Sequence, residues 1–404
     1  MISTCMKLAG MGVALLLASC AGLPDFSDFS SEGGGKEHAA VATAESNEMP
    51  GHRVRGGVSV AWQTNVDQRA PASPSGFSLP FAFERDGRSL IVAGARDRRA
   101  RIYNQSGQEL LRIALEHPSE SGALLLENGL VVVGDVQGVL YGLDPIKGTV
   151  VWSRQLSSLI LGKPVALQDG FVVQTADNRI YSFSAAGKKR WSYTGKLGGI
   201  AMHMGASPLF VDGQIYAVFT NGDVVALKAE SGALLWRRQL ILKAGAAVLS
   251  ELRVPVADPV LVKHSQDAQD GDALLIAFYQ GDLVMLSRLD GSRIFNRKIS
   301  LKTSPLTVGQ TVYVAGSDGA VQALDVQSGQ TLWKQKLSEG ELVGPVLWRD
   351  NLWIADDQGV VFRLDTQGNT LGSRKLSGRI ERSPVPMPAG VLVRNDLGTL
   401  YLLR

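Results

Sequence analysis

From residue 57 onward, short runs of Val, Leu, Ile and Tyr alternate with turns that carry Gly, Asp or Asn. Each apolar run is only a few residues long and is bounded by turn residues, which is the pattern of a β-strand. A larger unit also recurs, and its clearest copy runs from Ser304 through Asp325 and Gly329 to Trp333. These patterns predict an all-β chain with no room for crossover helices.

The repeating unit carries an aromatic or leucine anchor near its end. The anchors recur about 44 residues apart, the length of a four-stranded propeller blade, and they are Trp62, Leu111, Trp152, Trp191, Trp236, Phe295, Trp333 and Leu371. The copies number eight rather than seven, and the last stops before its fourth strand. We therefore predict an eight-bladed β-propeller of four-stranded antiparallel blades over residues 57–404. The N-terminal strand at 57–62 should pair with the last blade and close the ring.

Five tryptophans share one position in the repeat. A large aromatic side chain at such a position is expected to pack between neighbouring blades rather than to bind a ligand. The structural repeat residues are Trp62, Trp152, Trp191, Trp236 and Trp333.

The first twenty residues depart from the repeat. An apolar run over residues 8–17 follows Lys7 and is about half as long as the ~20 residues of a spanning helix. We expect residues 1–19 to be an export signal peptide. The tetrad at 17–20 resembles a bacterial lipobox, which implies that Cys20 is acylated. The alternatives are a plain secretory signal and a buried N-terminal helix with an incidental cysteine. Because Ala21 follows it instead of aspartate, the same resemblance implies a lipid anchor in the outer membrane, on the periplasmic face.

We predict that residues 20–56 comprise the lipidated cysteine and a flexible tether. They are rich in Gly, Ser, Ala, Glu and Asp and show no sustained strand period. A coil of this length reaches roughly 30–36 Å. Of the two cysteines, Cys5 would leave with the signal and Cys20 would carry lipid, so we expect no disulfide.

Charge and histidine patterns exclude two classes of function. The 41 Lys and Arg residues against 38 Asp and Glu residues leave a formal charge of +3, too little for a surface that tracks nucleic acid phosphates. The five histidines lie far apart, and the sequence contains no HExxH or CxxC motif. We therefore expect neither a nucleic acid partner nor a metal site.

The repeat consists, in order, of Asp or Asn followed by Gly, then Tyr-x-Leu-Asp, Gly and Trp. This repeat resembles that of the quinoprotein (PQQ-type) propellers, and the resemblance covers residues 57–404. Together with the lipobox and a single propeller, it is similar to the BamB family of outer-membrane protein assembly lipoproteins. The resemblance implies a non-catalytic scaffold without a cofactor. Such a scaffold would bind the POTRA domains of BamA and other components of the BAM complex, and would help nascent outer-membrane proteins fold and insert. Strand addition is one way in which it could meet a β-rich substrate.

An enzyme is the alternative of another class. PQQ-dependent dehydrogenases hold a planar quinone and a metal in the propeller centre and use an aspartate base, and a ligand-binding periplasmic propeller is a further alternative. This sequence has no adjacent cysteines and no CxxCH haem motif. We expect no enzymatic activity, although the 38 carboxylates leave candidates for a base.

Two insertions interrupt the repeat on either side of the fourth full blade, at residues 196–205 and 240–256. Their apolar and methionine side chains, flanked by charge, are typical of a protein interface, and a small helix that caps its own blades is the alternative. In the BamB family the corresponding loops face BamA, and its charged contacts map loosely onto His203, Glu251, Arg253 and Asp258. The predicted partner-binding residues are Ile200, Met202, His203, Met204, Leu249, Glu251, Leu252, Arg253 and Asp258.

Overall fold

The structure is a computed structural model and describes residues 57–67, 79–160, 162–196, 205–240, 254–263 and 271–404. All of these belong to Arg53–Arg404, the larger of the two compact units into which the chain divides. The described residues form eight four-stranded antiparallel sheets and no helix. Consequently, no helix in this part of the chain is long and apolar enough to cross a membrane.

Each sheet is one blade, numbered here in chain order. Blade 1 contains β2 (Phe81–Arg85), β3 (Arg88–Ala95), β4 (Arg99–Asn104) and β5 (Glu109–Ala114). Blade 2 contains β6 (Ala123–Leu125), β7 (Val131–Gly134), β8 (Val139–Asp144) and β9 (Thr149–Gln155). Blade 3 contains β10 (Val165–Leu167), β11 (Gly170–Thr175), β12 (Arg179–Ser184) and β13 (Lys189–Thr194). Blade 4 contains β14 (Leu209–Val211), β15 (Gln214–Val218), β16 (Asp223–Lys228) and β17 (Leu234–Gln239).

The second half of the ring repeats the arrangement. Blade 5 contains β18 (Val260–Lys263), β19 (Asp272–Ala277), β20 (Leu283–Ser287) and β21 (Arg293–Arg297). Blade 6 contains β22 (Leu306–Val308), β23 (Thr311–Ala315), β24 (Ala320–Asp325) and β25 (Thr331–Lys336). Blade 7 contains β26 (Leu342–Trp348), β27 (Asn351–Asp356), β28 (Val360–Leu364) and β29 (Thr370–Lys375). Blade 8 contains β30 (Val385–Met387), β31 (Gly390–Arg394), β32 (Thr399–Leu403) and β1 (Val60–Asn65).

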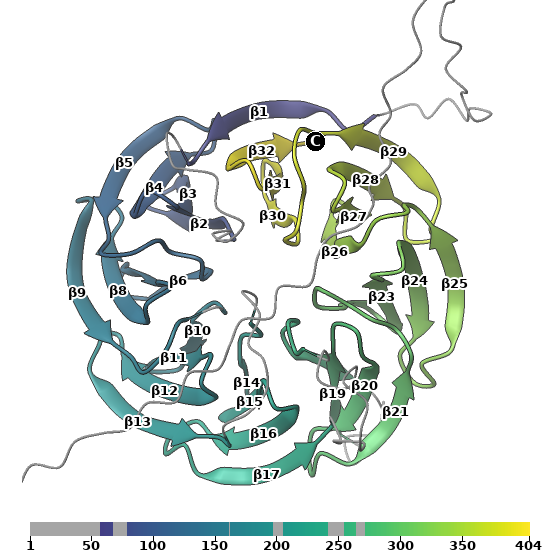
Figure 1. The fold of residues 1–404 in the computed structure, drawn as a ribbon, viewed down its shortest axis with the longest axis horizontal. Helices are drawn as coiled ribbons and strands as arrows, with labels where there is room; N and C mark the ends of the chain where they lie inside the picture. Colours follow the sequence, from purple (N-terminus) through teal and green to yellow (C-terminus); the bar gives the residue numbers. More distant parts are fainter. Residues whose placement is uncertain (1–56, 68–78, 161, 197–204, 241–253, 264–270) are drawn as a thin grey trace, which may run out of the picture. The chain divides into compact units, whose positions relative to one another are not determined.

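The predicted eight-bladed propeller is confirmed. Figure 1 shows the blades around a central axis, with the first strand of each blade inside and the fourth strand on the outer wall. The middle strands are buried on both faces, as in β7 and β16, because each blade is covered by a neighbour on either side. The outer strands instead alternate in burial, as in β13, because only one of their faces meets a neighbour.

The hydrophobic core lies between the blades. The buried apolar residues that the structure describes form eight clusters, one for each pair of neighbouring blades. The cluster between blades 4 and 5, for example, joins Tyr216 and Trp236 to Leu274 and Ile276. Burial of this apolar surface is the main force that holds successive blades together.

Each of the repeated tryptophans packs against a glycine of the next blade. The indole Nε1 of Trp62 donates to the carbonyl of Gln105 at 2.8 Å, and Trp236 donates to the carbonyl of Arg288 at 3.0 Å. A Cβ atom on the facing glycine would come within 2.5–2.9 Å of the indole, so no larger residue fits. These glycines also have positive φ angles, and they are Gly107, Gly187, Gly232, Gly291 and Gly368.

The two ends of the propeller pair with each other. β1 runs antiparallel to β32, with Trp62 opposite Leu402 and Asn65 opposite Thr399. The pairing continues beyond the strands, because the backbones of Ser59 and Arg404 exchange two hydrogen bonds of 2.9 Å. In Figure 1 the purple first strand therefore lies against the yellow last strand. The predicted closure by the N-terminal strand is confirmed.

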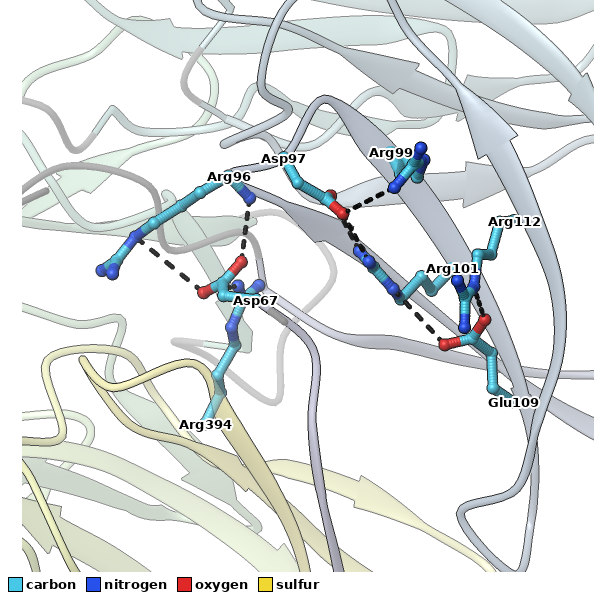
Figure 2. Close-up of polar contacts among 8 residues, drawn as sticks. All are labelled: Asp67, Arg96, Asp97, Arg99, Arg101, Glu109, Arg112 and Arg394. Carbon is cyan, nitrogen blue, oxygen red and sulfur yellow. Dashed lines mark hydrogen bonds and ion pairs between the residues drawn. The ribbon is translucent and has the colours of Figure 1, made fainter. Parts of the chain in front are cut away.

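A buried carboxylate locks this closure. Asp67, two residues after β1, accepts a hydrogen bond from Arg394 Nη2 of blade 8 at 2.9 Å and one from the backbone N–H of Arg96 of blade 1 at 2.8 Å (Figure 2). The side chains of Asp67 and Arg394 are 4% and 2% exposed. Arg96 in turn donates to the carbonyl of Asp396 at 2.9 Å. One side chain thus joins the N-terminal segment to both blades at the seam.

A second charged cluster stabilises blade 1 itself. Arg101 is 1% exposed and donates to Asp97 at 2.8 Å, while its Nε lies 3.4 Å from a carboxylate oxygen of Glu109 (Figure 2). Burial raises the pKa of Asp97, but hydrogen bonds and positive charge from Arg101 and Arg99 outweigh it and leave the pKa below its usual value. Asp97 therefore stays charged at neutral pH and pairs with the charged Arg101.

Candidate partner-binding site

One face of the ring carries all the links between blades. Because the strands within a blade are antiparallel, the links from an outer strand to the next inner strand lie on the same face as the turns between second and third strands. We call this the connector face. Both predicted insertions are such links, so the predicted interface belongs to this face.

Most of the predicted partner-binding residues lie outside the described residues. These are Ile200, Met202, His203, Met204, Leu249, Glu251, Leu252 and Arg253. The predicted lipidation site, Cys20, also lies outside them. The structure describes Asp258 and the residues from which both insertions begin and to which they return.

Asp258 is held at the inner end of the blade 4 to blade 5 link. Its Oδ1 accepts the backbone N–H of Ser207 at 2.6 Å, and its Oδ2 lies 3.6 Å from Lys163 Nζ. The backbone N–H of Asp258 donates to Ser304 Oγ at 2.9 Å. Asp258, predicted to contact a partner, therefore joins its own blade 5 to blades 3 and 4 through its carboxylate and to blade 6 through its backbone N–H.

These contacts form a chain of residues that each precede a proline. Lys163 N–H donates to Ser207 Oγ at 2.9 Å, and Ser207 N–H then donates to Asp258. A residue before proline favours an extended backbone, which leaves its N–H free to reach the adjacent blade. The Ser-Pro and Asp-Pro pairs of the repeat thus align the inner strands around the axis.

The returning ends of the two insertions meet. Gly205 and Ala206 lie at the end of the first insertion. Val254 and Pro255 come directly after the undescribed residues of the second insertion. All four line one small recess, together with residues of the blade 3 turn. Val254 pairs with Tyr279 of blade 5 through two backbone hydrogen bonds of 2.9 and 3.1 Å. Two segments about fifty residues apart in sequence therefore lie side by side at the connector face.

Residues that precede the next two blades hold the Tyr279 side chain in place. Its hydroxyl donates to Glu341 Oε1 at 2.9 Å, and Glu341 also pairs with Lys302, whose Nζ lies 5.3 Å from the Tyr279 ring centroid. Burial raises the pKa of Tyr279, and the hydrogen bond to Glu341 raises it further. The hydroxyl therefore stays protonated and keeps the end of the second insertion in place.

Asn178 fixes the start of the first insertion. Its Nδ2 donates to the carbonyl of Lys196 at 2.9 Å, and its Oδ1 accepts from the N–H and hydroxyl of Thr220 at 2.9 and 3.0 Å. Asn178 is buried and has a φ of 63°, a left-handed conformation that Asn tolerates better than most residues. A signal for it exists in the repeat, because glycine stands at the equivalent turn position in two other blades, as Gly138 and Gly319, and both have positive φ angles.

Replacing Asn178 with alanine is expected to destabilise the protein by about 2–3 kcal/mol, since it removes these hydrogen bonds and leaves a non-glycine residue at positive φ. The midpoint of urea unfolding measures the loss. Asn178→Gly relieves the backbone strain and should lose less. Equal losses for the two variants would show that the strained backbone contributes nothing.

The connector face opens into a central cavity of about 320 Å³ lined by residues of all eight blades. Its charged lining includes Glu120, Lys163, Asp258, Lys302 and Arg382. Burial lowers the pKa of the Arg382 guanidinium, and the charges of Glu120, Glu381 and Asp258 act in the opposite direction. The cavity is thus lined with charges of both signs that face one another.

These residues do not fit a quinone cofactor and its metal. A quinone needs flat faces to stack against, yet none of the described lining residues is aromatic. A metal needs several carboxylate or imidazole ligands, and no group of three such residues occurs within the described ranges. Among the described residues that line the cavity, the carboxylates are Glu120 and Asp258, and Asp258 is occupied by Ser207 and Lys163.

Comparison with known proteins agrees with the repeat and the ring. The family described as "Outer membrane protein assembly factor BamB" matches residues 96–335 and 317–403. This chain belongs to the BamB family. BamB of Escherichia coli strain K12 is 24% identical over 403 residues, which cover 98% of this chain and 97% of that protein. BamB of Burkholderia pseudomallei is 24% identical over 324 residues, which cover 79% and 82%.

A solved structure shows the same fold. The crystal structure of BamB from Moraxella catarrhalis superposes with a TM-score of 0.71 at 21% sequence identity and covers 86% of this chain and 99% of that one. The family match begins at Arg96, so it omits β1 and Asp67 but includes Arg96 and Arg394 of the seam.

Proposed function

We propose that this protein is a non-catalytic scaffold lipoprotein of the outer-membrane β-barrel assembly (BAM) complex. It binds the POTRA domains of BamA through the connector face at blades 3 to 5 and assists the folding and insertion of outer-membrane proteins. Its relatives are named outer membrane protein assembly factors, and a lipid on Cys20 would hold it at the periplasmic face of the outer membrane. The lining of its central cavity supports a role without a quinone.

One observation carries the proposed location of the interface. The two insertions that break the repeat end beside one recess, where Gly205 and Ala206 meet Val254 and Pro255. A rigid base of this kind, braced by Asn178, Asp258 and Tyr279, can present two loops together to one partner. Loops on a rigid scaffold are where binding is most often located.

The proposal is tested by titrating the full chain, purified in detergent, against the isolated POTRA domains of BamA. Met202→Asp combined with Leu252→Asp is expected to weaken binding at least tenfold, because it places charge in the apolar part of the predicted interface. Calorimetry or surface plasmon resonance measures the affinity, and circular dichroism checks the fold.

Leu289→Asp is the matched control. Leu289 is 84% exposed in a turn on the opposite face of the ring, so the same change of residue type should leave the affinity unchanged. Failure of the unaltered protein to bind the POTRA domains would refute the proposed function. Equal losses for the control and the paired variant would refute the proposed surface.

A further inference from the structure

A second cavity, of about 430 Å³, lies at the junction of blades 5 and 6. Its lining comes from the end of β21 and the link that follows it, from the turn between β23 and β24, and from β24 and β25 themselves. Ile299 is the only apolar residue among the described ones that line it. The cavity is therefore suited to a polar ligand.

The cavity exists because blade 6 has a shorter side chain where three other blades have a ring. Gln322 directly precedes the β-bulge between the third and fourth strands of its blade. The residues at this position in blades 2, 3 and 8 are Tyr141, Tyr181 and Tyr401. All three tyrosines are buried, and each packs in the cluster that joins its blade to the preceding one.

In those blades the tyrosine ring spans the gap to the link from the preceding blade. The hydroxyl of Tyr181 donates to Ser157 Oγ at 2.8 Å, and that of Tyr401 lies 2.7 Å from Ser377 Oγ. The serine at the equivalent place in the blade 5 to blade 6 link is Ser300, which lines the cavity together with Gln322. The space between these two side chains is thus the space that a tyrosine fills elsewhere in the ring.

Gln322 has a buried amide without a partner. The residue is 6% exposed, yet its side chain forms no hydrogen bond with any residue of the described ranges. A buried polar group that lacks a hydrogen bond is destabilising. The amide offers two donors and one acceptor to a ligand. Hydroxyl groups of a ligand in the cavity would therefore satisfy it.

The described residues around the cavity have a net charge of +2. Arg297, Lys298 and Lys334 are cationic, and Asp318 is the one carboxylate among them. Lys334 Nζ donates to Asp318 at 2.9 Å, and Arg297 donates to the carbonyl of Gly329 at 2.7 Å. Lys298 is exposed and forms no ion pair within the described part of the chain. Its charge is available to an anion.

We propose that this cavity binds a small phosphate monoester that also carries hydroxyl groups, such as a sugar phosphate. A phosphate monoester has close to two negative charges at neutral pH, which matches the net charge of the lining. Lys298 and Lys334 supply ammonium donors for its oxygens. The amide of Gln322 and the hydroxyl of Ser300 are the partners for its hydroxyl groups.

This ligand site is separate from the candidate partner-binding site. None of its described lining residues belongs to the recess at Gly205 and Val254. The inference goes beyond the proposed function and does not depend on it. Binding of the POTRA domains by the variants below should match that of the unaltered protein.

The test is a calorimetric titration of the full chain in detergent with glucose 6-phosphate. We expect saturable binding of one ligand per chain, weakened at 0.5 M NaCl because salt screens charges that are open to solvent. Glucose and inorganic phosphate should each bind at least tenfold more weakly, since each offers only part of the ligand. Equal binding of succinate, a dianion without a phosphoryl group, would overturn the assignment to a phosphate.

The same chemical group could be free in solution or belong to a lipid. Hexanoyl lysophosphatidic acid is a soluble lipid with a phosphate monoester and a hydroxyl group, and it is titrated in the same way. Tighter binding of this lipid than of glucose 6-phosphate would identify a lipid headgroup as the source. Tighter binding of glucose 6-phosphate would identify a free sugar phosphate. Saturable binding of neither compound would overturn the proposal.

Gln322→Tyr fills the cavity with the residue that blades 2, 3 and 8 have at this position. It should weaken binding of the phosphate ester at least tenfold. Because the tyrosine hydroxyl can reach Ser300 as its equivalents reach their serines, the midpoint of urea unfolding should not fall. Unchanged affinity in this variant, with the fold intact by circular dichroism, would overturn the assignment to the cavity.

A pair of charge reversals tests the site without filling it. Lys298→Glu should weaken binding at least fivefold. Lys375→Glu is the matched control, because Lys375 is exposed at the same position of blade 7, where Tyr401 fills the junction with blade 8. The control should change the affinity less than twofold. Equal effects of the two reversals would overturn the proposal, whether or not Gln322→Tyr folds.

Discussion

Replacing Asp67 with alanine is expected to cost about 3–5 kcal/mol of unfolding free energy, the typical loss when one partner of a buried ion pair is removed. Arg394 would keep a buried positive charge without the carboxylate that accepts its 2.9 Å hydrogen bond. The backbone N–H of Arg96 would lose its acceptor as well. Because Asp67 follows β1 directly, its loss should also loosen the strand that closes the ring.

Urea unfolding followed by tryptophan fluorescence measures this loss. Release of β1 would expose the edge of β32, so we also expect more aggregation on heating, which light scattering detects. Asp169→Ala is the control, since Asp169 is 80% exposed and its pairing with Arg190 at 3.8 Å should contribute little. An unfolding midpoint for Asp67→Ala equal to that of the control would contradict the role assigned to the seam.

Replacing Trp236 with alanine is expected to destabilise the protein by about 3–5 kcal/mol, as for other buried large aromatic residues. Trp236 is 9% exposed and packs at 6.0 Å from Tyr216, between blades 4 and 5. Its removal leaves a cavity beside Gly291, which has no side chain that could fill it, and it leaves the carbonyl of Arg288 without its donor.

Chemical unfolding again gives the measurement, and Leu332→Ala is the comparison. Trp333 is the equivalent of Trp236 in blade 6, and Leu332 directly precedes it. Leu332 is 58% exposed, so its replacement should change the free energy of unfolding by less than about 0.5 kcal/mol. If Trp236→Ala were no worse than Leu332→Ala, the tryptophan would not be a structural anchor of the ring.

The fold was predictable because its signals are local and repeated. Each blade has the same apolar runs, the same polar turns and the same anchor, so errors in any one copy are corrected by the others. The incomplete last copy and the spare strand at residues 57–62 even predicted the closure of the ring, which the pairing of β1 with β32 confirms.

The candidate site was less predictable. The two insertions stand out because they break the period, but their sequence does not say that Gly205 and Val254 line one recess. The repeat pattern does not show that the side-chain amide of Asn178 joins Lys196 to Thr220. Asp258 was predicted to contact a partner, and only the structure shows that its carboxylate also binds Ser207 and Lys163 of neighbouring blades.

The sequence by itself thus determined the blade, the number of copies and the order of strands, because these depend on residues close together in the chain. Only the tertiary structure decided which distant residues meet. Asp67 and Arg394 are far apart in sequence and become neighbours through closure of the ring. The Lys and Arg residues of the outer strands likewise gather on one surface only when the last strands of blades 1 to 7 are placed around the ring, since each of these strands carries at most two of them.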